Sequence, residues 1–173
     1  MAWTTPKTWN VDELLTAANL NTHLRDNLNA LKAPPTDHYE CDEASEYTTT
    51  STSFVDVDGT NLALTITTSG GDVLVHFHAS VVHTNNGKIF FDMTLDGSRI
   101  SRDDGFLGGY VSNAGAGNTA SSWMSFTRLV TGVAAGEHTF VLQWRTTAST
   151  AKLFAGATTG QDVHPQFWAR EVS

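Results

Sequence analysis

The sequence predicts a mostly β protein, an antiparallel jelly-roll-like β-sandwich preceded by one short N-terminal α-helix. Three observations support this prediction. Apolar residues recur at spacings of three and four between residues 16 and 33, which indicates a helix. Beyond residue 35 the spacing changes to two, which is typical of strands. Turn signals rich in glycine and asparagine then divide residues 36–173 into roughly eight to ten short strands.

The predicted domain organisation is a helical attachment or trimerisation segment over residues 1–35 and a sandwich domain over residues 36–173. A chain of 173 residues suits one main domain with a small appendage. Pro34 and Pro35 separate the two parts, because neither can continue a helix.

The helix is expected to begin after Thr16, whose hydroxyl can cap its first turn, and to end by Lys32 or Ala33. An isolated helix of about sixteen residues is marginal in water, so it needs a partner. Either it docks on its own domain, or its copies associate about an oligomer axis or enter a socket in another protein. An asparagine within the apolar stripe would fix register at some cost in stability. The stripe residues are Leu20, Leu24, Asn27, Leu28 and Leu31.

The strands are predicted from alternating apolar and polar positions and from the turns between them. Gly70-Gly71 is expected to be a turn, and Gly132 and Gly136 are expected to bracket a loop. Asp96-Gly97 is the preferred two-residue hairpin turn, because both positions tolerate positive φ. The clearest predicted strands span residues 62–67, 73–82, 89–96, 123–130 and 138–145.

Several predicted strands carry apolar residues on both faces, whereas a sandwich monomer needs only one buried face per strand. The surplus predicts a second buried surface, such as a subunit interface. The residues behind this expectation include Leu74, Val82, Phe90, Trp123 and Leu129.

Charge and composition exclude several classes of function. The formal net charge of −8 argues against binding to nucleic acid or to anionic lipid. No secretory signal and no stretch as long as a transmembrane helix is visible, so we expect synthesis in a cytoplasm without export by the general secretory route. Cys41 is the one cysteine, which rules out an intrachain disulfide.

Catalytic motifs are missing, so we expect a protein that is not an enzyme and needs no cofactor. Cys41 stands among Glu40, Asp42 and Glu43, whose charges would raise the pKa of its thiol and weaken it as a nucleophile.

Two short motifs are candidate metal sites. His76 and His78 lie on one face of a predicted strand, and imidazole suits iron, zinc, nickel or copper. The alternative is two ordinary histidines on a polar or interface face. Residues 101–105 cluster the hard oxygen ligands that calcium prefers, although a plain turn explains them as well.

The longest stretch without strand periodicity, residues 105–121, is the candidate ligand-binding loop. Tyr110, Asn113 and Asn118 offer an aromatic platform and amide groups that suit a sugar. The alternative is a glycine-rich connector or part of an oligomer contact. Residues 146–161 form a second candidate loop.

The N-terminal segment resembles that of many bacteriophage and prophage tail-fibre and head-fibre proteins. The resemblance covers the run Thr5-Pro6-Lys7-Thr8-Trp9, then Glu13, Thr16-Ala17, Leu20-Asn21 and Arg25-Asp26-Asn27-Leu28. The body, through residues 53–57, 62–66, 91–97 and 135–144 and the closing 170–172, is similar to the C-terminal domains of phage fibres. Those domains are of the trimeric jelly-roll type of complement C1q and tumour necrosis factor.

This resemblance implies a non-enzymatic virion structural protein, a homotrimer that forms a fibre, a head fibre or a capsid decoration. It implies attachment to other virion proteins through residues 1–35, contact with host surface glycans, and a place in the virion after synthesis in the host cytoplasm. The alternative is a monomeric carbohydrate-binding module without virion attachment.

Overall fold

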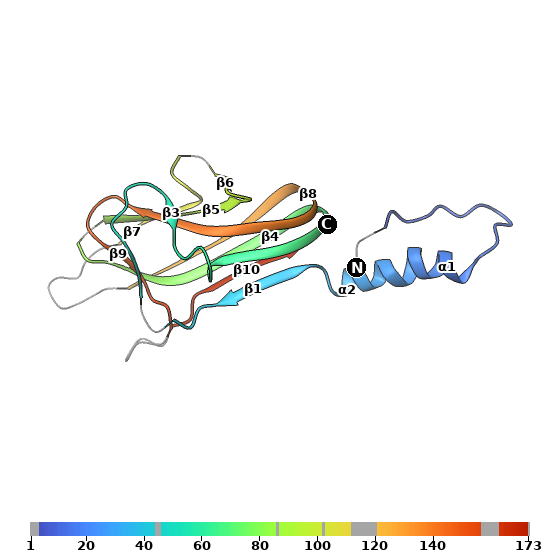
Figure 1. Cartoon of the computed structure of the whole chain (residues 1–173), viewed down its shortest axis with the longest axis horizontal. Coiled ribbons are helices and arrows are strands. Elements are labelled where there is room, and N and C mark those ends of the chain that lie inside the picture. The colour runs from blue at the N-terminus through green and yellow to red at the C-terminus, as the bar shows by residue number, and fades with distance from the viewer. Residues whose placement is uncertain are drawn as a thin grey trace.

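The structure is a computed structural model that describes residues 4–43, 46–85, 87–101, 103–111, 121–156 and 163–172. Figure 1 shows a body of β-strands from which the helix projects at one end. The N-terminal segment runs outward beside the helix and then turns back into it, and the C-terminus lies at the same end of the body as the root of the helix.

The helix begins and ends where the sequence predicted. Thr16 is its N-cap and accepts a hydrogen bond from the Asn19 backbone N–H at 3.1 Å. Its last residue is Lys32, before the two prolines. A π-helical stretch at its centre, with a wider turn than an α-helix, was not predicted. The three consecutive parts are α1 (Ala17–Leu20), η1 (Asn21–Asp26) and α2 (Asn27–Lys32).

The named strands are paired antiparallel throughout the described chain. This confirms the predicted fold class, an antiparallel, jelly-roll-like β-sandwich with a short N-terminal helix. The strands are β1 (Thr36–Glu40), β2 (Tyr47–Thr49), β3 (Val55–Asp56), β4 (Ala63–His83), β5 (Gly87–Leu95), β6 (Ser98–Arg99), β7 (Leu107–Val111), β8 (Ser122–Thr146), β9 (Ala151–Leu153) and β10 (Gln166–Glu171).

The two longest strands, β4 and β8, build both layers of the sandwich. They pair with each other from Ala63↔Val141 to Val81↔Ser122. The later part of β4 also pairs with β10, which pairs with β1. The later part of β8 also pairs with β5, which carries β6 and β7. The β4–β8 ladder therefore bends, so that one half lies in each layer of the sandwich. In Figure 1, β5 and β6 lie above the ladder and β1 and β10 lie below it.

Two predicted chain reversals are wrong. Gly70-Gly71 and the segment from Gly132 to Gly136 lie inside β4 and β8, which continue through them. The ladder shifts register between Gly71 and Val73, and φ is +99° at Gly70 and +69° at Gly132. A glycine pair allows either a tight turn or a bulge that bends a strand, and here it bends two strands together. The hairpin turn at Asp96-Gly97 is confirmed, with φ of +51° and +79°.

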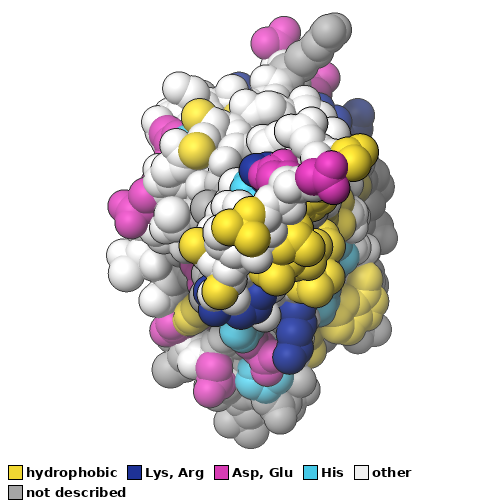
Figure 2. All heavy atoms as spheres, turned by 90° about the vertical axis from the view of Figure 1, so that its right-hand side faces the viewer, with side chains coloured by type: hydrophobic (Ala, Val, Ile, Leu, Met, Phe, Trp, Pro, Cys, Tyr) yellow, Lys and Arg dark blue, Asp and Glu magenta, His cyan; other side chains and the backbone are white. Residues whose placement is uncertain are grey.

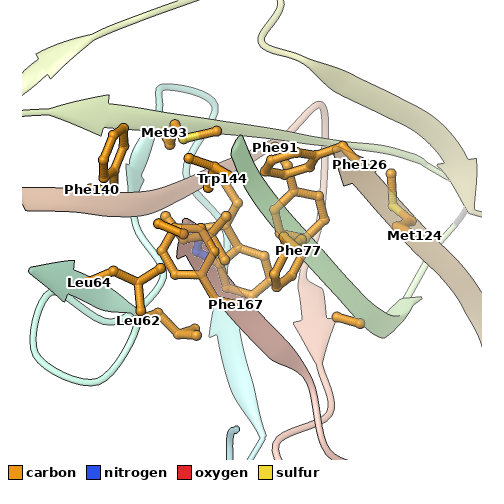
Figure 3. Packing of buried hydrophobic residues seen from close by; sticks show 14 of the residues in the cluster. Leu62, Leu64, Phe77, Phe91, Met93, Met124, Phe126, Phe140, Trp144 and Phe167 are labelled. Carbon is orange, nitrogen blue, oxygen red and sulfur yellow. The ribbon is translucent and has the colours of Figure 1, made fainter. Parts of the chain in front are cut away.

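Aromatic side chains from both layers meet in the core (Figure 3). The Phe77 ring of β4 has its centroid 5.0 Å from that of Phe91 of β5 and 6.4 Å from that of Phe167 of β10. Trp144 of β8 stacks on Phe91 at 6.2 Å. These rings are at most 1% exposed, and each buried phenylalanine contributes roughly 1.5–3 kcal/mol to folding.

The bend in β8 gives a direct test of the glycine argument. Among the described residues, no atom lies within 4 Å of the position that a Cβ at Gly132 would take, so only backbone conformation opposes a side chain there. We expect Gly132→Ala to lower the free energy of unfolding in urea by about 1 kcal/mol, the cost of left-handed backbone for an L residue. Gly132→Asn is the matched control and should lose less, because asparagine tolerates this conformation. Equal losses in the two variants would contradict the argument.

Candidate oligomerisation and attachment surface

The leucines of the helix are exposed to solvent. Leu20, Leu24, Leu28 and Leu31 have 37%, 51%, 64% and 64% of their surface exposed. Figure 2, which views the molecule from the end that carries the helix, shows apolar side chains gathered on one side. The described parts of the chain therefore leave the predicted stripe uncovered.

Three more exposed apolar residues precede the helix. Val11, Leu14 and Leu15, in the segment that leads into the helix, are 92%, 79% and 58% exposed. A group of apolar side chains of this size, exposed in one region, is typical of an interaction surface.

Asn27 does not share this exposed stripe, and the expectation that it does is corrected here. Its side chain is buried, with 4% of the residue exposed. Its Oδ1 accepts from the Thr4 backbone N–H at 2.9 Å, and its Nδ2 donates to the Thr4 carbonyl at 2.8 Å and to the His23 carbonyl at 3.2 Å. Asn27 therefore holds the N-terminal segment against the helix.

The N-terminal segment covers a different face of the helix from the leucines. The Trp9 ring meets His23 edge-on, with 6.2 Å between ring centroids. The Lys7 ammonium lies 5.1 Å from the centre of the Trp9 ring and forms an ion pair with Glu13. Because this segment packs beside His23 and Asn27, the helix has one face covered by its own chain and an apolar face left open.

A hollow of about 610 Å³ lies where the helix meets the body. Leu31 and Pro34 line it from the helix side, and Leu74, Trp168 and Val172 line it from the sheet. The hollow thus joins the inner end of the stripe, at Leu31, to the outer face of the sheet, at Leu74 and Trp168. The sequence pattern gave Leu74 as a surplus apolar residue but did not single out Trp168, which occupies an outward position of β10.

The outer face of the four strands β1, β10, β4 and β8 continues this surface. Its cross-strand partners include His38↔Trp168 and Trp168↔His76, and Trp123 and Leu129 of β8 are 68% and 44% exposed. Trp123 and Leu129 therefore lie exposed on the outer face, where the sequence predicted a second apolar surface.

Part of the predicted apolar surplus is covered within the chain. Val82 is 1% exposed and belongs to the interior. The Phe90 ring lies 4.0 Å from the Arg145 guanidinium, and a Cβ at Gly108 would come within 2.5 Å of the same ring. For Val82 the prediction of a subunit contact is wrong, because its side chain is buried inside the sandwich. Phe90 is half-buried by these neighbours.

His76 and His78 lie next to each other on this face, with ring centroids 5.7 Å apart. The His76 ring also stacks on Trp168 at 5.3 Å, and its Nδ1 lies 2.8 Å from the Thr127 Oγ1. Among the described residues, no group of three or more histidine, cysteine, aspartate or glutamate side chains is placed to hold a metal ion. The structure therefore brings the two imidazoles together but adds no third ligand from the described chain.

The predicted sugar-binding loop falls mostly outside the described residues. Asn113 and Asn118 lie outside the described residues, and Tyr110 belongs to β7, where its backbone pairs with Lys88.

In the candidate calcium turn, the Asp104 carboxylate accepts a hydrogen bond from Arg145 at 2.8 Å and is occupied by that ion pair. Of the second candidate loop, the structure describes β9 and the residues up to 156.

Cys41 is fully buried, and its thiol lies 3.7 Å from the Tyr47 hydroxyl, which donates to Asp58 at 2.9 Å. Burial raises the pKa of this thiol, and the charges of Glu43 and Asp58 raise it further. The predicted direction of the pKa shift is confirmed, but burial is the larger cause.

In the described part of the chain, no helix is long and apolar enough to cross a membrane.

The histidine pair predicts a pH effect on the outer face. Burial lowers the pKa of His76, and the neighbouring His78 lowers it further. The folded chain therefore holds His76 neutral, and its stability falls as the pH drops below the ordinary value of about 6.5. We expect an NMR titration to give His76 a pKa below that value. His78→Gln should raise it part of the way, because burial remains, and a pKa above the ordinary value would contradict the placement of His76.

Comparison with known proteins adds little to this description. No family model matches the sequence, and no curated protein matches it. Among solved structures, the chain is similar to the Eiger TNF of S. frugiperda, with 11% sequence identity, a TM-score of 0.49, and coverage of 82% of this chain and 94% of that one. A likeness at this level is too weak to support an argument, so the fold assignment depends on the strand pairing described above.

Proposed function

We propose that this chain is a non-enzymatic structural protein of a phage particle, assembled as a homotrimer and displayed as a fibre, a head fibre or a capsid decoration. Residues 1–35 associate about the trimer axis or attach the protein to other virion components. The β-sandwich is carried outside the particle and contacts host surface glycans. The phage assignment and the number three come from the resemblance of the sequence to phage fibre proteins.

The observation that carries the proposal is the exposed leucine stripe on a helix that projects from the body. Burying one leucine is worth roughly 1.5–3 kcal/mol, so association of these helices would recover a large free energy. The helix also needs that gain, because a free helix of this length is marginal. Its N-terminal segment supports one face only, through Asn27 and Trp9.

Continuity between the helix and the sheet supports a closed ring of identical copies. Leu31 lines the same hollow as Leu74 and Trp168, so the stripe and the outer face of the sheet form one surface. In a cyclic oligomer each copy buries the same patch, and copies arranged about one axis would cover both parts of this surface together.

The oligomer is tested by light scattering on the full chain and on two variants. We expect a trimer for the full chain and dissociation for the double variant Leu24→Gln/Leu28→Gln, because glutamine keeps helix propensity but loses the apolar contact. Val55→Thr, at a 38% exposed residue of β3 in the other layer of the sandwich, is the control, and we expect it to stay trimeric. A trimer that survives the double variant would place the main interface in the β body. A monomeric full chain would overturn the proposal and favour the monomeric carbohydrate-binding module.

The virion assignment has its own test. Mass spectrometry of purified particles should detect the chain at a fixed copy number per capsomer, vertex or tail, in multiples of three. As a control, circular dichroism on the separately purified chain should show that it is folded. Absence from particles that contain the other structural proteins would remove the virion role and leave the oligomer result unchanged.

A further inference from the structure

Arg128 occupies a position of β8 that faces the interior of the sandwich. Met124 and Phe126 precede it at alternate positions and are 6% and 9% exposed. The cross-strand partners of Phe126 and Arg128 are Phe77 and Val75, which are fully buried. Arg128 is nevertheless exposed. A charged residue at an interior-facing position is uncommon and requires a reason.

The guanidinium of Arg128 has no acidic partner in the described part of the chain. Its recorded contact is the Phe106 ring, whose centre lies 5.3 Å away. Two other arginines of the body form ion pairs: Arg99 with Asp92 at 2.6 Å and Arg145 with Asp104 at 2.8 Å. In a chain with 18 acidic and 10 basic residues, an uncompensated arginine at this position is available to an external anion.

A hollow of about 440 Å³ lies beside Arg128, with Ile100, Gly105 and Phe106 on one side and β8 on the other. Ser101 lines it together with Phe106 and Phe126, whose rings are tilted with centroids 5.6 Å apart. This volume falls within the range of roughly 300–1,000 Å³ that is typical of small-molecule sites. The site combines a fixed cation, a hydroxyl group and an aromatic wall.

The wall of the hollow is held in place by the sheet. The Phe106 backbone N–H donates to the Phe91 carbonyl of β5 at 2.9 Å. Gly105 has φ of +79°, and a Cβ there would come within 2.4 Å of the same carbonyl oxygen. The backbone therefore passes so close to β5 that only glycine fits, and the hollow exists before any ligand binds.

We propose that this hollow binds the carboxylate of an acidic sugar, such as a uronic or sialic acid. The planar guanidinium of Arg128 pairs with a carboxylate through two parallel hydrogen bonds. The Phe106 ring, against which Phe126 packs, receives the apolar C–H face of the sugar ring. The inference rests on the glycan contact of the proposed function, to which it gives a site and a ligand class, and it does not depend on the trimer.

The test is a titration of the full chain by NMR and calorimetry with glucuronic acid and N-acetylneuraminic acid, and with glucose as the neutral analogue. We expect saturable binding of the acids and binding of glucose at least about tenfold weaker, the usual effect of losing a charged hydrogen-bonding partner. Arg128→Gln should weaken binding of the acids by the same factor. Lys88→Gln, at an exposed cation of β5 that lines neither hollow, is the control and should bind as the parent does.

Three results would overturn the inference: unchanged affinity in Arg128→Gln, equal affinity for glucose, or equal affinity for acetate or inorganic phosphate, which would mark a site for a simple anion only. Light scattering on the same samples separates this inference from the proposed function. An intact trimer that binds no acidic sugar removes the site alone. A monomer that binds through Arg128 keeps the site and removes the trimeric assembly.

Discussion

The pairing of β4 with β8 is the interaction on which the rest of the structure depends. Each strand contributes to both layers, so one bent ladder sets the distance between the layers. It carries β3, β5, β9 and β10 at its edges, and the remaining strands pair with those. The bend needs backbone conformations that Gly70 and Gly132 adopt without strain. Because the two strands bend at the same level, Phe77 and Phe91 face each other across the core, and this contact closes the sandwich.

The molecule divides its apolar residues between two purposes. Inside the body they are shielded nearly completely, and the aromatic rings reach one another from both layers. On the helix and at its root they are left open, although the N-terminal segment is folded back along the helix and held by Asn27. A helix that is covered on one face and apolar on another is prepared for a partner, which is why the proposed assembly uses this end of the molecule.

The outer surface carries two different kinds of recognition chemistry. The face with Trp168, His76 and Leu129 is broad and combines exposed aromatic and aliphatic side chains with histidines and other polar residues, which suits a protein partner. The hollow at Arg128 is small, with one cation and aromatic walls, which suits a small anionic ligand. The two sites lie on opposite sides of β8, since Thr127 and Arg128 are neighbours in a strand and point to opposite faces.

The sequence by itself determined the helix, its cap at Thr16, the Asp96-Gly97 hairpin and the β class, because each depends on local periodicity or on the conformation of one or two residues. Its apolar stripe was also visible as a pattern. Only the tertiary structure decided that the glycines at 70 and 132 bend strands, that Asn27 binds Thr4, and that Arg128 stands beside a hollow. Those outcomes depend on which distant segment lies opposite each residue, and local pattern does not carry that information.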